Sequence, residues 1–163
     1  MVIRRIGDDE WEAWRALRLA ALADAPWAFS STVAGESALT DEEWRERTRL
    51  LAGGDARAMF VADEAGALVA CGGAFPDGAG SVAVTSMWTA PSHRGRGLAR
   101  RLLTAIEEWA RARGARRLVL DVVDGNAAES VYARAGFGRT GNAEPMRRDA
   151  GLLMVEMERL LEG

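Results

Sequence analysis

The chain has 163 residues, of which 48% are hydrophobic and 28% are charged, and its formal net charge is −3 at pH 7. That length is enough for one domain with a buried core, and the lack of net positive charge argues against a protein that binds nucleic acid. The single cysteine, Cys71, excludes an intramolecular disulfide. With no run of about 18 apolar residues and no apolar N-terminal run, we expect a cytoplasmic protein with no membrane partner and no nucleic-acid partner.

The first third of the chain predicts one strand and two helices. Residues 2–6 predict an opening strand, and Asp8 is placed to cap the helix after it. That helix is expected to bury one face, formed by Trp11, Trp14, Leu17 and Ala21. Pro26 ends it, and residues 27–39 are small, polar and irregular in pattern. Residues 40–43 have the pattern of a capping box and predict the second helix.

The rest of the chain predicts a sheet interrupted by two helices. Strands are predicted at residues 57–62, 68–75, 81–89, 116–123, 136–141 and 152–159. The run at 116–123 is apolar on both alternations, which is typical of a central strand covered on both faces. A helix from Leu98 to Arg113 has one apolar face, and Asn126 is placed to cap a shorter helix. This order favours a mixed α/β sheet with helices on both faces.

The most informative segment is Pro91-Ser92-His93-Arg94-Gly95-Arg96-Gly97-Leu98-Ala99, between an apolar strand and an amphipathic helix. The first N–H groups of a helix have no internal partner and lie at the positive end of the helix dipole. Glycines permit positive φ and let an anion approach the backbone, while Arg94 and Arg96 add positive charge. The segment therefore predicts a site for a ligand that carries phosphate. The alternatives are a plain surface turn and a chance tract that resembles a nucleic-acid-binding sequence.

Two motifs, taken in order, resemble those of the GNAT superfamily of N-acetyltransferases. The first, Arg94 to Ala99, fits a phosphate loop of the form Arg/Gln-x-x-Gly-x-Gly/Ala, and the residues before it look like the end of the family's fourth strand. The second consists of Asn126 and the run Tyr132-Ala133-Arg134-Ala135-Gly136-Phe137. Asn126 lies one residue closer to the tyrosine than is usual in the family. The order of predicted elements also matches, so the resemblance covers nearly the whole chain.

The resemblance implies one acetyltransferase domain over residues 1–163, with a mixed, mostly antiparallel sheet splayed between its fourth and fifth strands. It implies transfer of an acetyl group from acetyl-CoA to a primary amine, a small molecule or a peptide, by direct attack in a ternary complex. It requires no metal and allows a homodimer. The alternative from another class is a non-catalytic, regulatory domain that binds acyl-CoA, because residues 81–89 lack the acid that members often carry on the fourth strand.

The resemblance also assigns roles to individual residues. Tyr132 is the implied general acid for the leaving thiolate, and an N–H of Trp88 or Met87 is the implied oxyanion donor, which can supply about 3–4 kcal/mol. The implied coenzyme A contacts are Met87, Trp88, Thr89, Arg94, Gly95, Arg96, Gly97, Leu98, Ala99, Arg100 and Asn126. Proton transfer from a phenol of pKa about 10 to a thiolate whose thiol has pKa about 8.5 is uphill by about 2 kcal/mol. We therefore expect Tyr132 mainly to hydrogen-bond the sulfur.

The sequence indicates less about where the amine acceptor binds. The resemblance places the acceptor near Trp27, Phe29 and Glu36, with Trp88 as a further part of an aromatic wall. An amine that is protonated at neutral pH must lose a proton before it attacks. Glu36, Asp121 and a chain of water molecules are the alternatives for the general base.

Several of these residues also have simpler structural interpretations. Tyr132 can be a core side chain packed on Phe137, and Asn126 can serve only as a helix cap. Arg15 and Arg18 are expected on a solvated helix face. Pairing with a carboxylate such as Glu36, or binding an acidic acceptor, is the alternative for these two arginines.

Overall fold

The computed structural model describes residues 1–29, 31–147 and 149–162, but not the side chain of Trp27. Its strands are β1 (Val2–Arg5), β2 (Ala58–Glu64), β3 (Ala67–Pro76), β4 (Ser81–Thr89), β5 (Arg117–Val123), β6 (Gly138–Pro145) and β7 (Leu153–Leu160). Its helices are α1 (Trp11–Asp24), α2 (Val33–Ser37), α3 (Asp41–Ala52), α4 (Leu98–Ala112) and α5 (Ala128–Arg134), with 3₁₀ helices η1 (Pro26–Ala28) and η2 (Pro91–His93). No helix within the described ranges is long and apolar enough to cross a membrane.

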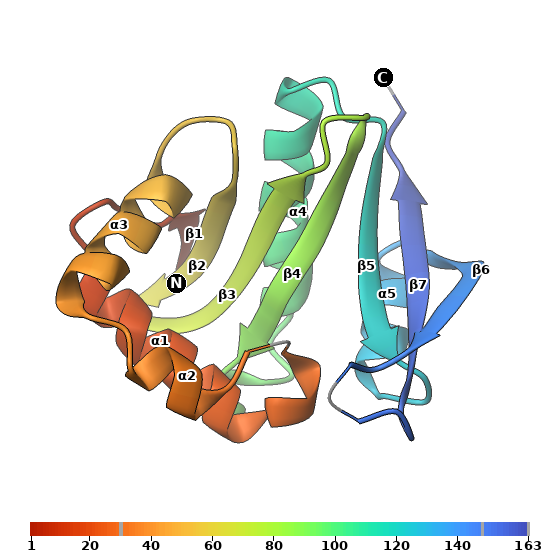
Figure 1. Cartoon of the computed structure of the whole chain (residues 1–163). Helices are drawn as coiled ribbons and strands as arrows, with labels where there is room; N and C mark the ends of the chain where they lie inside the picture. Colours follow the sequence, from red (N-terminus) through yellow and green to blue (C-terminus); the bar gives the residue numbers. More distant parts are fainter. Residues whose placement is uncertain (30, 148, 163) are drawn as a thin grey trace.

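The strands form a seven-stranded sheet in the order β1-β2-β3-β4-β5-β7-β6, which confirms the predicted mixed α/β fold. Every neighbouring pair is antiparallel except β4 and β5, which run parallel. This parallel pairing is short and joins residues 81–83 to residues 117–119. Beyond it the two strands diverge (Figure 1), so the later part of each strand has an unpaired edge. The predicted splay between the fourth and fifth strands is therefore present.

Helices cover both faces of the sheet (Figure 1). On one face, α4 packs through the apolar stripe that its sequence predicts, formed by Leu98, Leu102, Leu103, Ile106, Trp109 and Ala110. On the other face, α1 packs against β3 and α3 against β2, and the two helices bury Trp14 and Trp44. Farther along this second face, on β5, the side chain of Asp121 is exposed. The uncovered part of this face becomes one wall of the site described below.

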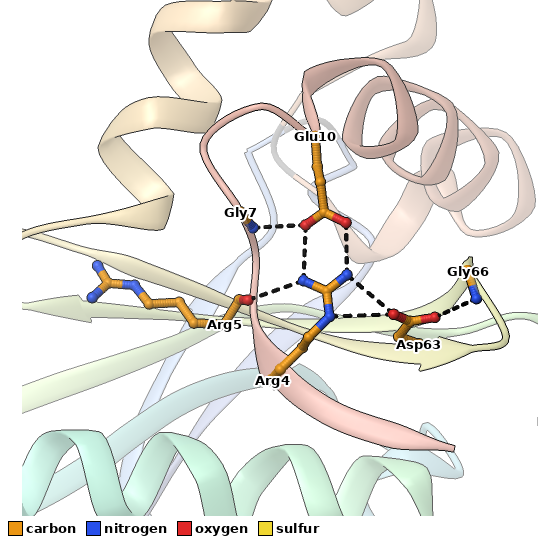
Figure 2. Close-up of polar contacts among 6 residues, drawn as sticks. All are labelled: Arg4, Arg5, Gly7, Glu10, Asp63 and Gly66. Carbon is orange, nitrogen blue, oxygen red and sulfur yellow. Dashed lines mark hydrogen bonds and ion pairs between the residues drawn. The ribbon is translucent and has the colours of Figure 1, made fainter.

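An ion-pair cluster fixes the start of α1 (Figure 2). Arg4 on β1 donates to both carboxylate oxygens of Glu10, at 2.6 and 2.8 Å, and to Asp63 on β2 at 3.2 and 3.3 Å. Glu10 also accepts the N–H of Gly7 at 2.7 Å. The prediction that Asp8 caps this helix was wrong: Glu10 occupies the N-cap position and makes no side-chain capping bond. The ion pair with Arg4 of β1 holds Glu10 at the start of α1. This contact is tertiary, so the local sequence pattern does not predict it.

Residues 27–39 contain a helix that the sequence pattern does not predict. Thr32 caps α2 by accepting the N–H of Gly35 at 3.0 Å. Glu36, within this five-residue helix, is only 3% exposed and pairs with Arg18 of α1. A helix this short is not stable alone, so its tertiary contacts account for it. Arg18 is consequently partly buried against α2, and the expectation of a solvated face was wrong for this residue.

We expect Arg4→Met to lower the free energy of unfolding by about 1–3 kcal/mol, because Glu10 and Asp63 would lose their shared cation. Denaturant unfolding followed by tryptophan fluorescence measures this loss. The hydrogen bond from Arg4 lowers the pKa of Glu10, so the stabilisation exists above the ordinary carboxyl pKa and is lost as pH falls through the lowered one. Arg49→Met is the control, because its pair with Glu46 is exposed and contributes less than about 1 kcal/mol. An equal loss in both variants would show that the cluster is unimportant.

Candidate active site

The loop between β4 and α4 presents a row of unpaired backbone N–H groups. Gly95 and Gly97 have φ values of +77° and +76°, a conformation that favours glycine. A Cβ added at either position would meet no atom within 4 Å, so the space above the loop is open. Within the described residues, the N–H groups from Gly95 to Arg100 have no hydrogen-bond acceptor. At the positive end of α4 these groups form a cradle for an anion.

The arginines and the tryptophan near this cradle differ in their partners. Arg94 pairs with Asp24 at the end of α1 and donates from Nε to the Thr89 carbonyl at 3.0 Å. Asp24 also accepts the indole N–H of Trp88 at 2.9 Å, and hydrogen bonds from Trp88 and then Arg94 lower the pKa of Asp24. The Trp88 ring is therefore part of the core and not of an open aromatic wall. Arg96 is exposed and forms no ion pair in the part of the chain described, so its charge is available to a ligand.

A β-bulge interrupts β4 next to the cradle. Gly73 on β3 lies opposite Thr85, and Cys71 lies opposite Trp88, so β4 contains one extra residue between these pairs. Ser86, within the bulge, has a φ of +55°, which residues other than glycine rarely adopt. Before the bulge the buried side chains of β4 face α4, whereas after it Trp88 packs with α1. The bulge thus turns the strand at the point where it leaves β5.

The backbone N–H groups after the bulge point alternately to β3 and to the open edge. The N–H of Ala90 donates to the carbonyl of Val69 on β3 at 2.8 Å. Since N–H directions alternate along an extended strand, the N–H of Trp88 also points to β3, and those of Met87 and Thr89 point to the open edge. Of the two predicted oxyanion donors, Met87 is the one with its N–H at this edge.

Tyr132 lies on α5 with its hydroxyl unpaired among the described residues. Its ring packs edge-on against Phe137, with the ring centroids 6.1 Å apart. Desolvation raises the pKa of Tyr132 to about 12, so the hydroxyl stays protonated and can donate a hydrogen bond. The Arg100 guanidinium donates to the carbonyl of Arg134 at 3.2 Å, which ties this helix to the start of α4. The phenol is thereby carried by a helix fastened to the cradle.

Two further predicted site residues, Asn126 and Glu36, also have partners within the fold. Asn126 accepts the N–H of Ala128 at 2.8 Å in a turn just before α5. The N-cap position of α5 is Ala127 and no side chain caps it, so the prediction that Asn126 caps this helix was wrong. Glu36 is held by Arg18 through two contacts of 3.1 Å and does not line the cavity described next. The side chain of Trp27, predicted for the acceptor, lies outside what the structure describes.

A cavity of about 290 Å³ opens on the uncovered face beyond the splay. Phe29, predicted for the acceptor, lines it, together with Asp121 on β5, Glu144 on β6 and Glu156 on β7. Asp121 and Glu156 are direct cross-strand partners. Desolvation, followed by the charges of Glu156 and Glu144, raises the pKa of Asp121. These carboxylates do not form a metal-binding group within the described residues.

Comparisons with known proteins agree with this geometry. The model of the acetyltransferase (GNAT) family matches residues 11–137. The fold is similar to that of a GNAT-family acetyltransferase from Streptococcus pneumoniae, with a TM-score of 0.83, 23% identity and 99% of each chain covered. It is also similar to a ribosomal-protein-alanine N-acetyltransferase from Brucella melitensis, with a TM-score of 0.76, 25% identity and coverage of 99% of this chain and 100% of that one. A protein from Salmonella typhimurium solved with its cofactor acetyl-CoA has a TM-score of 0.74 and 24% identity, with 100% of this chain and 95% of that one covered. No curated protein matches the chain significantly.

We expect Asp121→Asn to raise the melting temperature at neutral pH, because it removes a charge that desolvation and then the neighbouring carboxylates disfavour. Since the folded-state pKa of Asp121 is raised, the folded chain binds this proton more tightly than the unfolded chain, and stability falls as pH rises through the raised pKa. The gain should therefore shrink as pH falls to the ordinary carboxyl range. Calorimetry across this pH range measures it. Asp124→Asn, which removes a 2.7 Å pair with Arg139, is the control and should not gain stability. An equal gain in both variants would contradict the repulsion.

Proposed function

Because the chain belongs to the GNAT acetyltransferase family, we propose that it transfers the acetyl group of acetyl-CoA to a primary amine in a ternary complex, as one cytoplasmic domain that can form a homodimer. The observation that carries the proposal is the unpaired N–H row at the start of α4 beside the open edge of β4. The row suits a pyrophosphate, with Arg96 adding charge. The open edge suits the pantetheine amides, which pair with it as an added strand would.

Met87 is the proposed oxyanion donor. When an amine attacks the thioester, negative charge develops on the carbonyl oxygen. A backbone N–H already aimed at that oxygen needs no reorganisation during the reaction, and its loss costs about 3–4 kcal/mol. The N–H of Met87 is available to the thioester because β5, whose carbonyl groups would otherwise accept it, has diverged from β4.

Tyr132 is proposed to stabilise the leaving thiolate by a hydrogen bond. With the pKa of Tyr132 at about 12 and that of a thiol at about 8.5, complete proton transfer is uphill by about 5 kcal/mol. A hydrogen bond to the charged sulfur avoids that cost and is still strong, because it involves an ion. This role needs the hydroxyl protonated, as burial keeps it.

Asp121 is proposed as the general base, in preference to Glu36 or a water chain. It lies two residues beyond the last β5 residue paired with β4, and it lines the cavity on the acceptor side. Its raised pKa brings it nearer to neutral pH, where a base is more effective. Glu36 is unsuited because its carboxylate is occupied by Arg18. The cavity, about 290 Å³ with Phe29 in its wall, supports a small amine as the acceptor, whose ammonium the nearby carboxylates attract.

The proposal is tested by measuring free thiol release from acetyl-CoA with a panel of small amines, amino acids and peptide N-termini. We expect Tyr132→Phe to lower kcat by about 10- to 100-fold, the cost of one hydrogen bond to a charged group, with the KM for acetyl-CoA changed less. The ring and its contact with Phe137 are retained, so unfolding does not explain the loss. An unchanged kcat would remove Tyr132 from the mechanism. Binding of coenzyme A without thiol release from any amine would instead support a non-catalytic regulatory domain.

The pH dependence tests the base. In the wild type we expect kcat/KM for the amine to fall in acid, with the midpoint above the ordinary carboxyl pKa, since the pKa of Asp121 is raised. Asp121→Asn should remove this acid limb and lower kcat/KM by about 100-fold at neutral pH. Glu144→Gln is the matched control from the same cavity. It removes one charge that raises the pKa of Asp121, so the limb should move to lower pH and persist. The KM for the amine should rise, because one carboxylate that attracts the ammonium is lost. A wild-type limb that persists in Asp121→Asn would exclude this base.

A further inference from the structure

Arg18 joins three segments that are far apart in the sequence. Its Nε and Nη2 contact the Glu36 carboxylate on α2, each at 3.1 Å, and its Nη1 donates to Oγ of Ser86 on β4 at 2.9 Å. Its guanidinium carbon lies 4.8 Å from the centroid of the Phe29 ring. The side chains of Arg18 and Glu36 are 14% and 3% exposed. A single, partly buried cation therefore contacts both the acceptor-side segment and the β4 bulge.

Ion pairs this deeply buried are weak evidence of stabilisation, because removing two charges from water offsets their attraction. What Arg18 does supply is geometry, since its planar fork donates in fixed directions. The Nε and Nη2 atoms of the guanidinium are fixed by the Glu36 carboxylate, and this directs the Nη1 atom at the hydroxyl of Ser86. The Arg18–Glu36 ion pair is therefore better suited to positioning Ser86 than to stabilising the fold.

Ser86 is held from two sides. Arg18 binds its Oγ, and the Sγ–H of Cys71 on β3 donates to its carbonyl at 3.2 Å. Burial raises the pKa of Cys71 to about 12, so the thiol keeps this proton. The left-handed φ of +55° at Ser86 is unfavourable for a serine and persists only where surroundings enforce it. In this structure, the contacts with Arg18 and Cys71 hold Ser86 in this conformation.

The carbonyl of Ser86 and the N–H of Met87 belong to one peptide group. No cis peptide occurs in the described chain, and in a planar trans peptide the C=O and the N–H point in opposite directions. Because the carbonyl is directed to Cys71 on β3, the N–H of Met87 is directed away from β3, to the open edge. This conclusion agrees with the alternation of N–H groups along β4, reached independently.

We propose that Arg18 is a positioning residue for acetyl transfer: by holding Ser86 it sets the peptide whose Met87 N–H binds the thioester carbonyl, and through Glu36 it links that peptide to α2. This inference rests on the proposed function. It gives Glu36, a candidate base from the sequence, a different role, in which its carboxylate orients Arg18 and does not meet the amine.

The test uses acetyl-CoA labelled with carbon-13 at the carbonyl, bound to the full chain and observed by NMR, together with steady-state kinetics. A hydrogen bond to the carbonyl moves its signal from the position in free acetyl-CoA. In Ser86→Ala and Arg18→Met, we expect the bound signal to move back toward the free position. We expect kcat to fall by about 10- to 100-fold, at or below the loss of an oxyanion donor. The KM for acetyl-CoA should change by less than about twofold, because the phosphate cradle is untouched.

Further variants separate positioning from folding. Ser86→Gly lacks the hydroxyl but adopts positive φ without strain, so it should retain more kcat than Ser86→Ala. Replacing Arg18 and Glu36 together by Met leaves no unpaired buried charge and should fold while still losing kcat. Arg15→Met is the matched control from α1, because Arg15 pairs with Asp41 and not with Ser86; it should keep both the signal and kcat.

The outcomes distinguish this inference from the function on which it rests. If the wild type releases no thiol with any amine, the proposed function fails. If the wild type is active but Arg18→Met and Ser86→Ala keep its carbonyl signal and kcat, the positioning role is overturned. A loss of coenzyme A binding that parallels the loss of kcat in every variant would also overturn it, because that pattern indicates unfolding.

Discussion

The divergence of β4 from β5 is the constraint on which the whole site depends. A strand inside a sheet uses its N–H and C=O groups on both edges, so it has none left for a ligand. Here the parallel pairing stops after residue 83, and the rest of β4 has an open edge. The bulge at Ser86 turns the strand just beyond that point. The same irregularity that costs the sheet its hydrogen bonds therefore leaves free the donors that we propose for a thioester and its pantetheine arm.

Opposite charges lie on the two sides of this opening. On the donor side, unpaired N–H groups, the dipole of α4 and the exposed Arg96 present positive charge, which suits a phosphate. On the acceptor side, Asp121, Glu144 and Glu156 line a cavity and present negative charge, which suits an ammonium. Under the proposed function, the two reactants meet opposite charges on separate walls. The charges of Glu156 and Glu144, which would attract the amine, also raise the pKa of Asp121, the group proposed to deprotonate it.

Features that depend on neighbours in the chain could be predicted from the sequence. Thr40 caps α3 as its capping box indicates, accepting the N–H of Glu43 at 3.1 Å. The two glycines of the loop before α4 adopt the positive φ that an anion cradle needs. The prediction failed where a distant partner competed: Asp8 is a reasonable cap by pattern, but Arg4 favours Glu10. The helix α2 was missed for the same reason, since its tertiary contacts reach to α1.

The sequence by itself determined the strand, loop and helix of the donor side, because an N–H row at a helix start arises from consecutive residues. Only the tertiary structure decided the acceptor side. Asp121 and Glu156 come together through the register of two strands that are not consecutive. Arg18 meets Ser86 across 68 positions of the chain. No spacing in the sequence reports either contact, because each depends on how the two faces of the sheet are covered.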